Sequence, residues 1–235
     1  LLAAWKAELG ALDAAADLDG LERAAAEAER AWRKEAEAVS QARKRAAPKL
    51  GKAVTAAMQQ LGMAGGRFEA ALSALDAPQS YGLEGCEFLV AGHAGSTPRP
   101  LGKVASGGEL SRLALAIAVT TTAGPGASAG VPTLIFDEID AGVGGQVADS
   151  VGRLMKQLGR DTQVLAVTHL AQVAACADHH FVVSKAALAG RTVSDVQPVR
   201  GEARVAEVAR MLGGERLGGD TSRAHALAML GGKPA

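Results

Sequence analysis

Residues 133–138 read TLIFDE, an apolar run that is followed by two adjacent carboxylates, Asp137 and Glu138. A short apolar run is typical of a buried strand in a parallel sheet, and open α/β sheets bind ligands at the carboxyl ends of their strands. The position therefore suits Asp137 to hold Mg²⁺, directly or through water, and Glu138 to orient or deprotonate a water. The alternative is a polar exit from a strand into a loop.

Strand and helix patterns alternate on both sides of this segment. The sequence predicts helices over 109–121 and 146–158, a strand over 163–168, a short helix after His169 and a strand over 181–183. Alternation of this kind favours an α/β fold with a mostly parallel sheet that is covered on both faces. Further on, it predicts an edge strand over 191–199 and helices over 203–212 and 221–230, each ending at a glycine pair suited to a C-cap.

The helix over 109–121 is preceded by the sequence Ser106-Gly107-Gly108-Glu109. Ser at the N-cap and Glu three residues later form a capping box, which is common at ordinary helix starts. Two successive glycines also leave backbone N–H groups open at the positive end of the helix, where a phosphate can approach. Both interpretations remain open from these residues alone.

Two further elements accompany the acidic pair. His169 is expected to end the strand after it, at the same edge of the sheet, and this position favours a catalytic role over a structural one. Directly after the pair comes a glycine-rich turn, which is either a simple loop or, beside a nucleotide, a sensor of a neighbouring subunit. Its residues are Asp140, Ala141, Gly142, Val143 and Gly144.

A phosphate-binding P-loop is missing from the chain. That loop needs the pattern G-x-x-x-x-G-K-[ST], whose backbone N–H groups surround the phosphates. The three Gly-Lys pairs are followed by Ala53, Val104 and Pro234, and never by Ser or Thr. The chain therefore carries the later elements of a nucleotide-hydrolysing site without its phosphate cradle, as one lobe of a split ATPase would.

Residues 1–47 are rich in Ala, Glu, Arg and Lys, contain no proline, and place apolar residues three and four positions apart, beginning with Leu2, Trp5 and Leu9. This narrow stripe predicts the seam of a coiled coil, with a break between residues 12 and 18. Its partner helix is not in this chain. The alternative is an amphipathic helix on a globular core. Pro48 is expected to kink or end the arm near Ala47.

The predicted organisation is thus the return helix of an antiparallel coiled-coil arm over 1–50 and one lobe over 51–235. Within the lobe, helical periodicity resumes at 54–61 and stops at the glycines of 62–66. Residues 68–75 are ambiguous, 78–85 are expected as a loop, 87–91 as a strand, and 92–100 as a turn-rich loop.

The composition of the chain excludes several classes of protein. The formal net charge of +0 argues against a global basic field, so any DNA contact must be a local patch. The cysteines Cys86 and Cys176 lack metal or redox spacing and are expected to be buried, reduced thiols. No apolar run approaches the roughly 20 residues that span a bilayer, and no signal-peptide pattern is present. A soluble, cytoplasmic protein without membrane contact is expected.

The order of these motifs resembles the C-terminal lobe of an ABC-type ATPase head of the P-loop NTPase class. With the preceding helical arm, the resemblance narrows to the SMC-like repair and chromosome ATPases. Several stretches are similar to the RecN family of bacterial DNA repair proteins. They are Leu61-Gly62-Met63 with Gly66-Arg67-Phe68, then PRPLGKVASGGELSR at 98–112, LIFDEIDAGVGG at 134–145, VTHLAQV at 167–173 and RMLGG at 210–214.

The resemblance implies a role for each motif. The signature residues Ser106, Gly107, Gly108 and Glu109 would bind ATP held by the P-loop of an opposing head. Asp137 would serve Mg²⁺, Glu138 would be the general base, and His169 would be the switch histidine at the γ-phosphate. The turn Asp140–Gly144 would lie at the head–head interface.

The whole protein that the resemblance implies is an ATP hydrolase in recombinational repair of DNA double-strand breaks. It would be bacterial, nucleoid-associated and homodimeric through its heads, and it would bind DNA. This chain would be active only when completed by its N-terminal ATPase lobe. The alternatives are another SMC-like chromosome ATPase, a transporter subunit, which would lack the arm, or a non-catalytic coiled-coil adaptor with a degenerate lobe.

Overall fold

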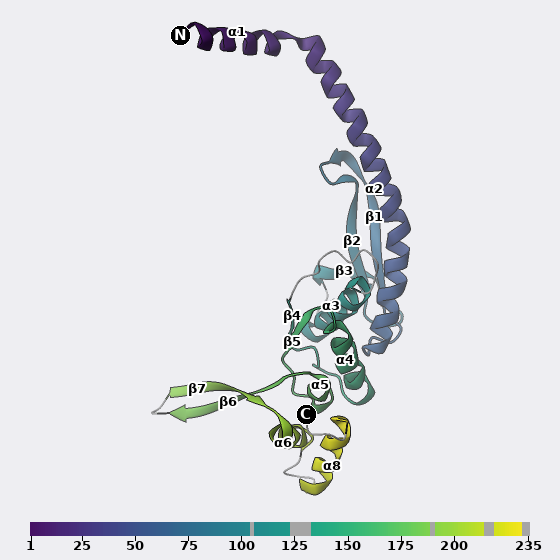
Figure 1. The fold of residues 1–235 in the computed structure, drawn as a ribbon. Coiled ribbons are helices and arrows are strands. Elements are labelled where there is room, and N and C mark those ends of the chain that lie inside the picture. The colour runs from purple at the N-terminus through teal and green to yellow at the C-terminus, as the bar shows by residue number, and fades with distance from the viewer. Residues whose placement is uncertain (104–105, 123–132, 189–190, 214–218, 232–235) are drawn as a thin grey trace. The chain divides into compact units, whose positions relative to one another are not determined.

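The computed structural model describes residues 1–103, 106–122, 133–188, 191–213 and 219–231 (Figure 1). The chain divides into two compact units. The first contains residues 1–49 and 70–87, and the second contains residues 50–69 and 88–235. A segment after the long second helix thus returns to the first unit, and the boundary between arm and lobe at residue 50 stays a prediction.

Two helices dominate the N-terminal part: α1 (Leu2–Ala16) and α2 (Leu18–Gln60). The predicted break falls at Asp17, whose carboxylate accepts a hydrogen bond from the Gly20 N–H at 2.9 Å and so satisfies the first turn of α2. Pro48 was expected to kink or end the helix, and it does not end it, because α2 continues through this residue. Proline removes one backbone donor, and the burial of neighbours such as Val54 outweighs that local loss.

A long hairpin replaces the loop that was predicted over 78–85. It consists of β1 (Arg67–Gln79) and β2 (Gly82–Ala91), which occupy neighbouring positions in a sheet with the short strand β3 (Arg99–Pro100). In the first unit the buried Glu84 accepts a hydrogen bond from the Ser40 hydroxyl of α2. Arg43 and Lys44 lie 3.9 and 3.8 Å from the same carboxylate. The hairpin is therefore held to α2 by a buried polar contact that the sequence pattern did not reveal.

The second unit contains the predicted α/β arrangement. After a short 3₁₀ turn (Leu101–Lys103) come α3 (Gly107–Thr122), β4 (Thr133–Phe136), α4 (Gly145–Leu158), β5 (Gln163–Ala166) and α5 (Ala171–Cys176). Strands β4 and β5 are parallel neighbours in the register Thr133↔Gln163 to Phe136↔Ala166. The core of this unit includes fully buried residues of α2, α3 and α4, among them Met58, Leu113 and Val151.

The C-terminal strands correct the predicted sheet. β6 (His180–Leu188) pairs along its whole length with β7 (Arg191–Val199) as an antiparallel hairpin, from His180↔Val199 to Leu188↔Arg191. In the described part of the chain, parallel pairing is thus confined to β4 and β5, although the α/β class is confirmed. A connection as short as 189–190 permits only antiparallel neighbours, because parallel strands need a long crossover.

Two helices close the unit, α6 (Gly201–Met211) and α8 (Gly219–Met229), and they pack around Val205, Val208 and Ala226. Each is followed by a glycine with positive φ, +84° at Gly213 and +79° at Gly231, as the predicted C-caps require. The second glycine of each pair, at 214 and 232, lies outside the described residues.

The cysteines only partly match their prediction. Both thiols are free, but Cys86 is exposed, whereas Cys176 is half-buried. Burial raises the pKa of Cys176, and Asp149 adds to that rise. Within the ranges described, no helix combines the length and the apolar character needed to cross a membrane.

Candidate functional site

The acidic pair lies just past the end of β4, where the sequence predicted it. The Val167 N–H donates to the Phe136 carbonyl at 3.0 Å, so the chain after β5 stays beside the chain after β4. The Ser111 hydroxyl of α3 donates to the Asp137 carbonyl at 2.8 Å, and the Glu138 N–H donates to the Asp137 carboxylate at 2.9 Å. Both acidic residues are exposed. They can therefore reach a ligand at this edge.

Glu138 has a strained backbone. Its φ of +53° makes it the one non-glycine residue with positive φ among the described ranges. Such a conformation costs on the order of 1–3 kcal/mol and persists where the surroundings impose it. Here the fully buried Ile139 anchors the following residue, and the Ala141 N–H donates to the Glu138 carbonyl at 3.1 Å. The turn thereby sends Glu138 outward while the chain beside it stays packed.

The glycines of the signature segment allow α3 to approach this turn closely. A Cβ added to Gly107 would lie 3.0 Å from a carboxylate oxygen of Glu138, and one added to Gly108 would lie 3.0 Å from the Ala141 Cβ. The Ser106 hydroxyl accepts from the Glu109 N–H at 3.4 Å, a long N-cap bond. Close packing thus accounts for both glycines, and it places the helix start beside Glu138. The preceding Ala105 lies outside the described residues.

Arg112 is a residue of this site that the sequence reasoning missed. It is only 8% exposed, and its guanidinium donates from Nη1 to the Ala141 carbonyl at 2.9 Å. Burial lowers its pKa, and Glu109 opposes that shift. The signal was present in the sequence, since an arginine directly before Leu113 stands on the buried face of α3. Arg112 ties the turn after β4 to the signature helix.

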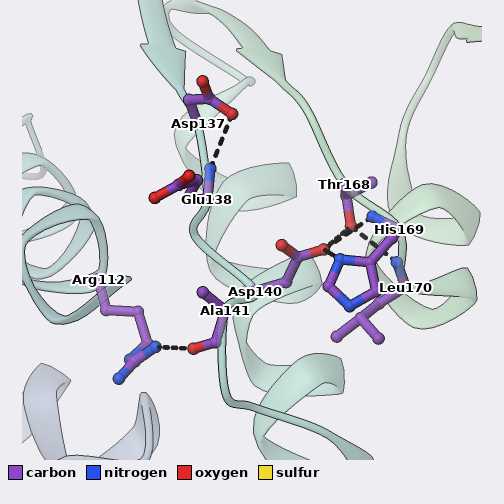
Figure 2. Close-up of polar contacts among 8 residues, drawn as sticks. All are labelled: Arg112, Asp137, Glu138, Asp140, Ala141, Thr168, His169 and Leu170. Atoms are coloured by element: carbon purple, nitrogen blue, oxygen red, sulfur yellow. Dashed lines mark hydrogen bonds and ion pairs between the residues drawn. The ribbon is translucent and has the colours of Figure 1, made fainter. Parts of the chain in front are cut away.

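Asp140 is buried and binds the segment that carries the histidine (Figure 2). One carboxylate oxygen of this residue accepts from the Thr168 hydroxyl, from the His169 N–H at 2.9 Å and from His169 Nδ1 at 3.2 Å. The same Thr168 hydroxyl accepts from the Leu170 N–H at 3.1 Å. Asp140 therefore orients His169, a positioning contact within one chain that spacing alone did not suggest.

His169 does not end its strand as predicted, because β5 stops at Ala166. The side chain of His169 is 72% exposed even though Nδ1 contacts Asp140. This contact fixes the ring and leaves Nε2 for a ligand. Of the predicted interface turn, Ala141, Gly142 and Gly144 are exposed, whereas the Asp140 carboxylate is used inside the chain.

The carboxylates suit Mg²⁺ only as part of a larger set of ligands. Within the described ranges, no group of three or more His, Cys, Asp or Glu side chains could hold a metal ion. Mg²⁺ keeps several waters and is commonly held by one or two carboxylates together with substrate phosphates. An exposed Asp137 with Glu138 beside it fits that kind of site. Such an arrangement can hold a metal–phosphate group and position a water.

Comparison with known proteins identifies relatives for most of the chain. No protein-family model matches it. It is 45% identical over 199 residues to DNA repair protein RecN of Xylella fastidiosa, covering 84% of this chain and 34% of that protein. The RecN proteins of Deinococcus radiodurans and Mycobacterium leprae are 43% and 42% identical over 83% and 91% of the chain. The chain spans about a third of the length of these relatives, 33% and 38% for the last two.

A similar solved structure is the Smc head domain with a coiled coil and joint from Pyrococcus yayanosii. It is 24% identical with a TM-score of 0.48, and the match covers 68% of this chain and 28% of that one.

The ordered motifs and the α/β fold agree with the lobe of an ABC-type ATPase head that the sequence predicted, preceded by a helical arm. More particularly, the chain corresponds to the C-terminal portion of the RecN DNA repair proteins.

Proposed function

We propose that this chain supplies one half of an ATP-hydrolysing site in a DNA repair ATPase that acts on double-strand breaks. One observation carries the proposal: the exposed pair Asp137–Glu138 follows β4 beside the start of α3, and a histidine that Asp140 orients follows the neighbouring strand β5. In our proposal these groups are the part of an ATP-hydrolysing site that comes after the P-loop in the sequence. The relatives are named DNA repair proteins, which supports a role of this ATPase in DNA repair.

In this proposal the chain's own residues have separate tasks. Asp137 holds Mg²⁺, directly or through water, and the metal neutralises charge on the phosphates. Glu138 accepts a proton from the attacking water as general base. His169, held through Nδ1, contacts the γ-phosphate region with Nε2. The strained backbone of Glu138 and the buried Asp140 keep these groups in place before ATP arrives.

The missing groups come from two partners. The chain's own N-terminal lobe supplies the P-loop, since the relatives are about three times longer and no P-loop occurs here. A second copy of the head supplies another signature segment, so that Ser106, Gly107, Gly108 and Glu109 bind ATP held by the opposing head. Ala141, Gly142, Val143 and Gly144 line the contact between the heads. ATP thus clamps two heads together, hydrolysis releases them, and the 235-residue chain alone is inactive. We place this protein in the bacterial cytoplasm, associated with the nucleoid.

The decisive experiment replaces the general base in the complete protein. Because a positioned base contributes roughly 10²–10⁴-fold, Glu138→Gln should lower ATP turnover by that factor while ATP binding survives and ATP-bound dimers accumulate. Steady-state ATP hydrolysis measures the turnover, and size-exclusion chromatography with ATP measures the accumulation of dimers. Asp161→Asn, which changes an exposed carboxylate outside this site, is the control. Wild-type turnover in Glu138→Gln would contradict the proposal.

The role of the signature segment is tested by Ser106→Asp in the complete protein. Asp caps a helix as well as Ser does, so a residue that only caps α3 should tolerate the change. A carboxylate that faces a γ-phosphate should instead repel it. We expect unchanged thermal stability and retained ATP binding, with loss of head pairing and hydrolysis. Full ATPase activity in this variant would return Ser106 to a capping role.

A further inference from the structure

A second cleft lies away from the acidic pair, at the far end of α4. It has a volume of about 710 Å³ and is formed by α4, the end of α5, α6 and the end of α8. Helix α4 begins at Gly145, directly after the glycine-rich turn. With a rise of about 1.5 Å per residue, its last turn lies about 20 Å further along the helix. The cleft is therefore distinct from the candidate hydrolysis site.

Positive charge dominates the cleft. Among the described residues, its lining contains Arg153, Lys156, Arg160 and Arg204 and one carboxylate, Asp178. Lys156 and Asp178 pair with each other. Among the residues that the structure describes, no carboxylate lies within ion-pair distance of the exposed Arg153 or Arg160. The chain as a whole has a formal net charge of +0, so this surplus is local.

Arg204 makes the inner wall of the cleft permanently cationic. It is 6% exposed, and its Nη2 donates to the carbonyls of Ala174, Ala175 and Ala177 at 3.3, 3.2 and 2.6 Å. Its Nε has no hydrogen-bond partner among the described residues. The Asp178 carboxylate, which also pairs with Lys156, interacts with the charge of Arg204, and an anion in the cleft would further offset the cost of burying that charge. The neighbouring His180 responds to the same environment, because burial and then Arg204 lower its pKa.

We propose that this cleft binds the phosphate backbone of DNA. Arg153 and Lys156 lie about one helical turn apart on α4, and Arg160 follows just after its end, so the cleft gathers three cations that suit the phosphates of one strand. Arginine guanidinium groups suit phosphate oxygens through paired hydrogen bonds. The described residues that line the cleft include no aromatic side chain, so they offer no stacking surface for a free nucleotide base. The choice of DNA as the source of phosphate rests on the proposed role in repair.

The test compares two double variants of the complete protein. Arg153→Gln/Arg160→Gln removes the two unpaired cations of the cleft, and Lys185→Gln/Arg191→Gln removes two exposed cations of the β6–β7 hairpin. Fluorescence anisotropy measures binding of labelled duplexes of two different sequences between 50 and 200 mM salt, a range over which phosphate contacts weaken strongly. A labelled ATP analogue and an acidic peptide are titrated in parallel.

For the cleft variant we expect weaker binding of both duplexes to the same degree. The slope of log K against log salt should become shallower by about two, because each phosphate contact contributes about one. DNA-independent ATP turnover and the melting temperature should not change, and the hairpin variant should bind DNA as the wild type does. An unchanged slope, an equal loss in both variants, or a loss confined to the ATP analogue or to the peptide would each overturn the proposal. DNA binding is read without hydrolysis, so failure of the ATPase proposal would be seen separately.

A second measurement needs no substitution in the cleft. Cys176 lines the cleft and Cys86 lies on β2, so peptide-resolved alkylation can follow both thiols at once. Saturating duplex DNA should slow the labelling of Cys176 severalfold and leave Cys86 unchanged. Equal labelling of Cys176 with and without DNA would place the DNA elsewhere.

Discussion

Two stretches with the same helical spacing differ completely in burial. Leu2, Trp5 and Leu9 of α1 are 68%, 61% and 61% exposed. The fully buried Val54 and Met58 of α2, with Leu61 just beyond it, have the same three- and four-residue spacing. Periodicity therefore identifies the apolar face of a helix but does not say whether this chain covers it.

The difference has a simple cause. Residues 50–61 pack into a core with buried residues of α3, α4, β2 and β4. No described residue covers the apolar stripe on α1 and the start of α2 in the same way. Leu18 and Leu21 extend that exposed stripe, at 66% and 55%. The arm is thus a helix whose apolar face requires another helix, and its pairing in a coiled coil stays a prediction.

The largest expected effect compares one apolar truncation in each stretch. Met58→Ala leaves a cavity in a packed core and should lower the free energy of unfolding by about 2–5 kcal/mol. Leu9→Ala removes a side chain that is already mostly in water and should change it by less than about 0.5 kcal/mol. Denaturant titration of the 235-residue chain measures both. Similar losses for the two variants would mean that the stripe is covered after all.

Amide hydrogen exchange, measured on this chain alone and on the complete protein, sharpens this comparison. If an outbound helix covers the stripe, backbone amides of α1 should exchange hydrogen at least about tenfold more slowly than in the chain alone, and Leu9→Ala should reverse that protection. Amides around Met58 should be equally protected in both proteins. Unchanged exchange in α1 would argue against a coiled-coil partner.

A smaller effect is expected from polar contacts. Asp140→Ala leaves the Thr168 hydroxyl and the His169 N–H without their buried acceptor, which should cost about 1–3 kcal/mol. Glu29→Ala removes an exposed i,i+4 ion pair with Arg33 on the arm and should cost at most about 0.5 kcal/mol. Thermal unfolding of both variants tests whether Asp140→Ala loses more stability than Glu29→Ala. Asp140→Ala with wild-type stability would contradict the buried contact seen in Figure 2.

The smallest pair of effects should have opposite signs. An alanine side chain at Gly108 would lie 3.0 Å from the Ala141 Cβ, so Gly108→Ala should destabilise the lobe by about 1 kcal/mol. Gly10 in the middle of α1 has nothing within 4 Å of an added Cβ. Gly10→Ala should therefore stabilise that helix by about 0.5–1 kcal/mol and increase ellipticity at 222 nm. A gain in both variants would show that α3 does not approach the turn closely.

The sequence predicted local elements well and long-range pairing less well. The helices over 109–121 and 146–158 and the break near Asp17 follow from periodicity and capping, which are properties of neighbouring residues. The antiparallel pairing of β6 and the hairpin across 78–85 were missed, because pairing depends on which strand lies alongside. Pro48 was expected to kink or end the helix, but α2 continues through it, with buried residues before and after it such as Ser40 and Val54.

By itself, the sequence determined the order of the motifs and the missing phosphate cradle, and it singled out Asp137, Glu138 and His169 as candidates, because each is a matter of residue type and spacing. Only the tertiary structure decided that Asp140 holds His169, that Arg112 ties α3 to the turn, and that arginines from α4 and α6 line one cleft. These contacts join residues about 30 positions or more apart. Chain packing in three dimensions brings them together, and no local pattern encodes that proximity.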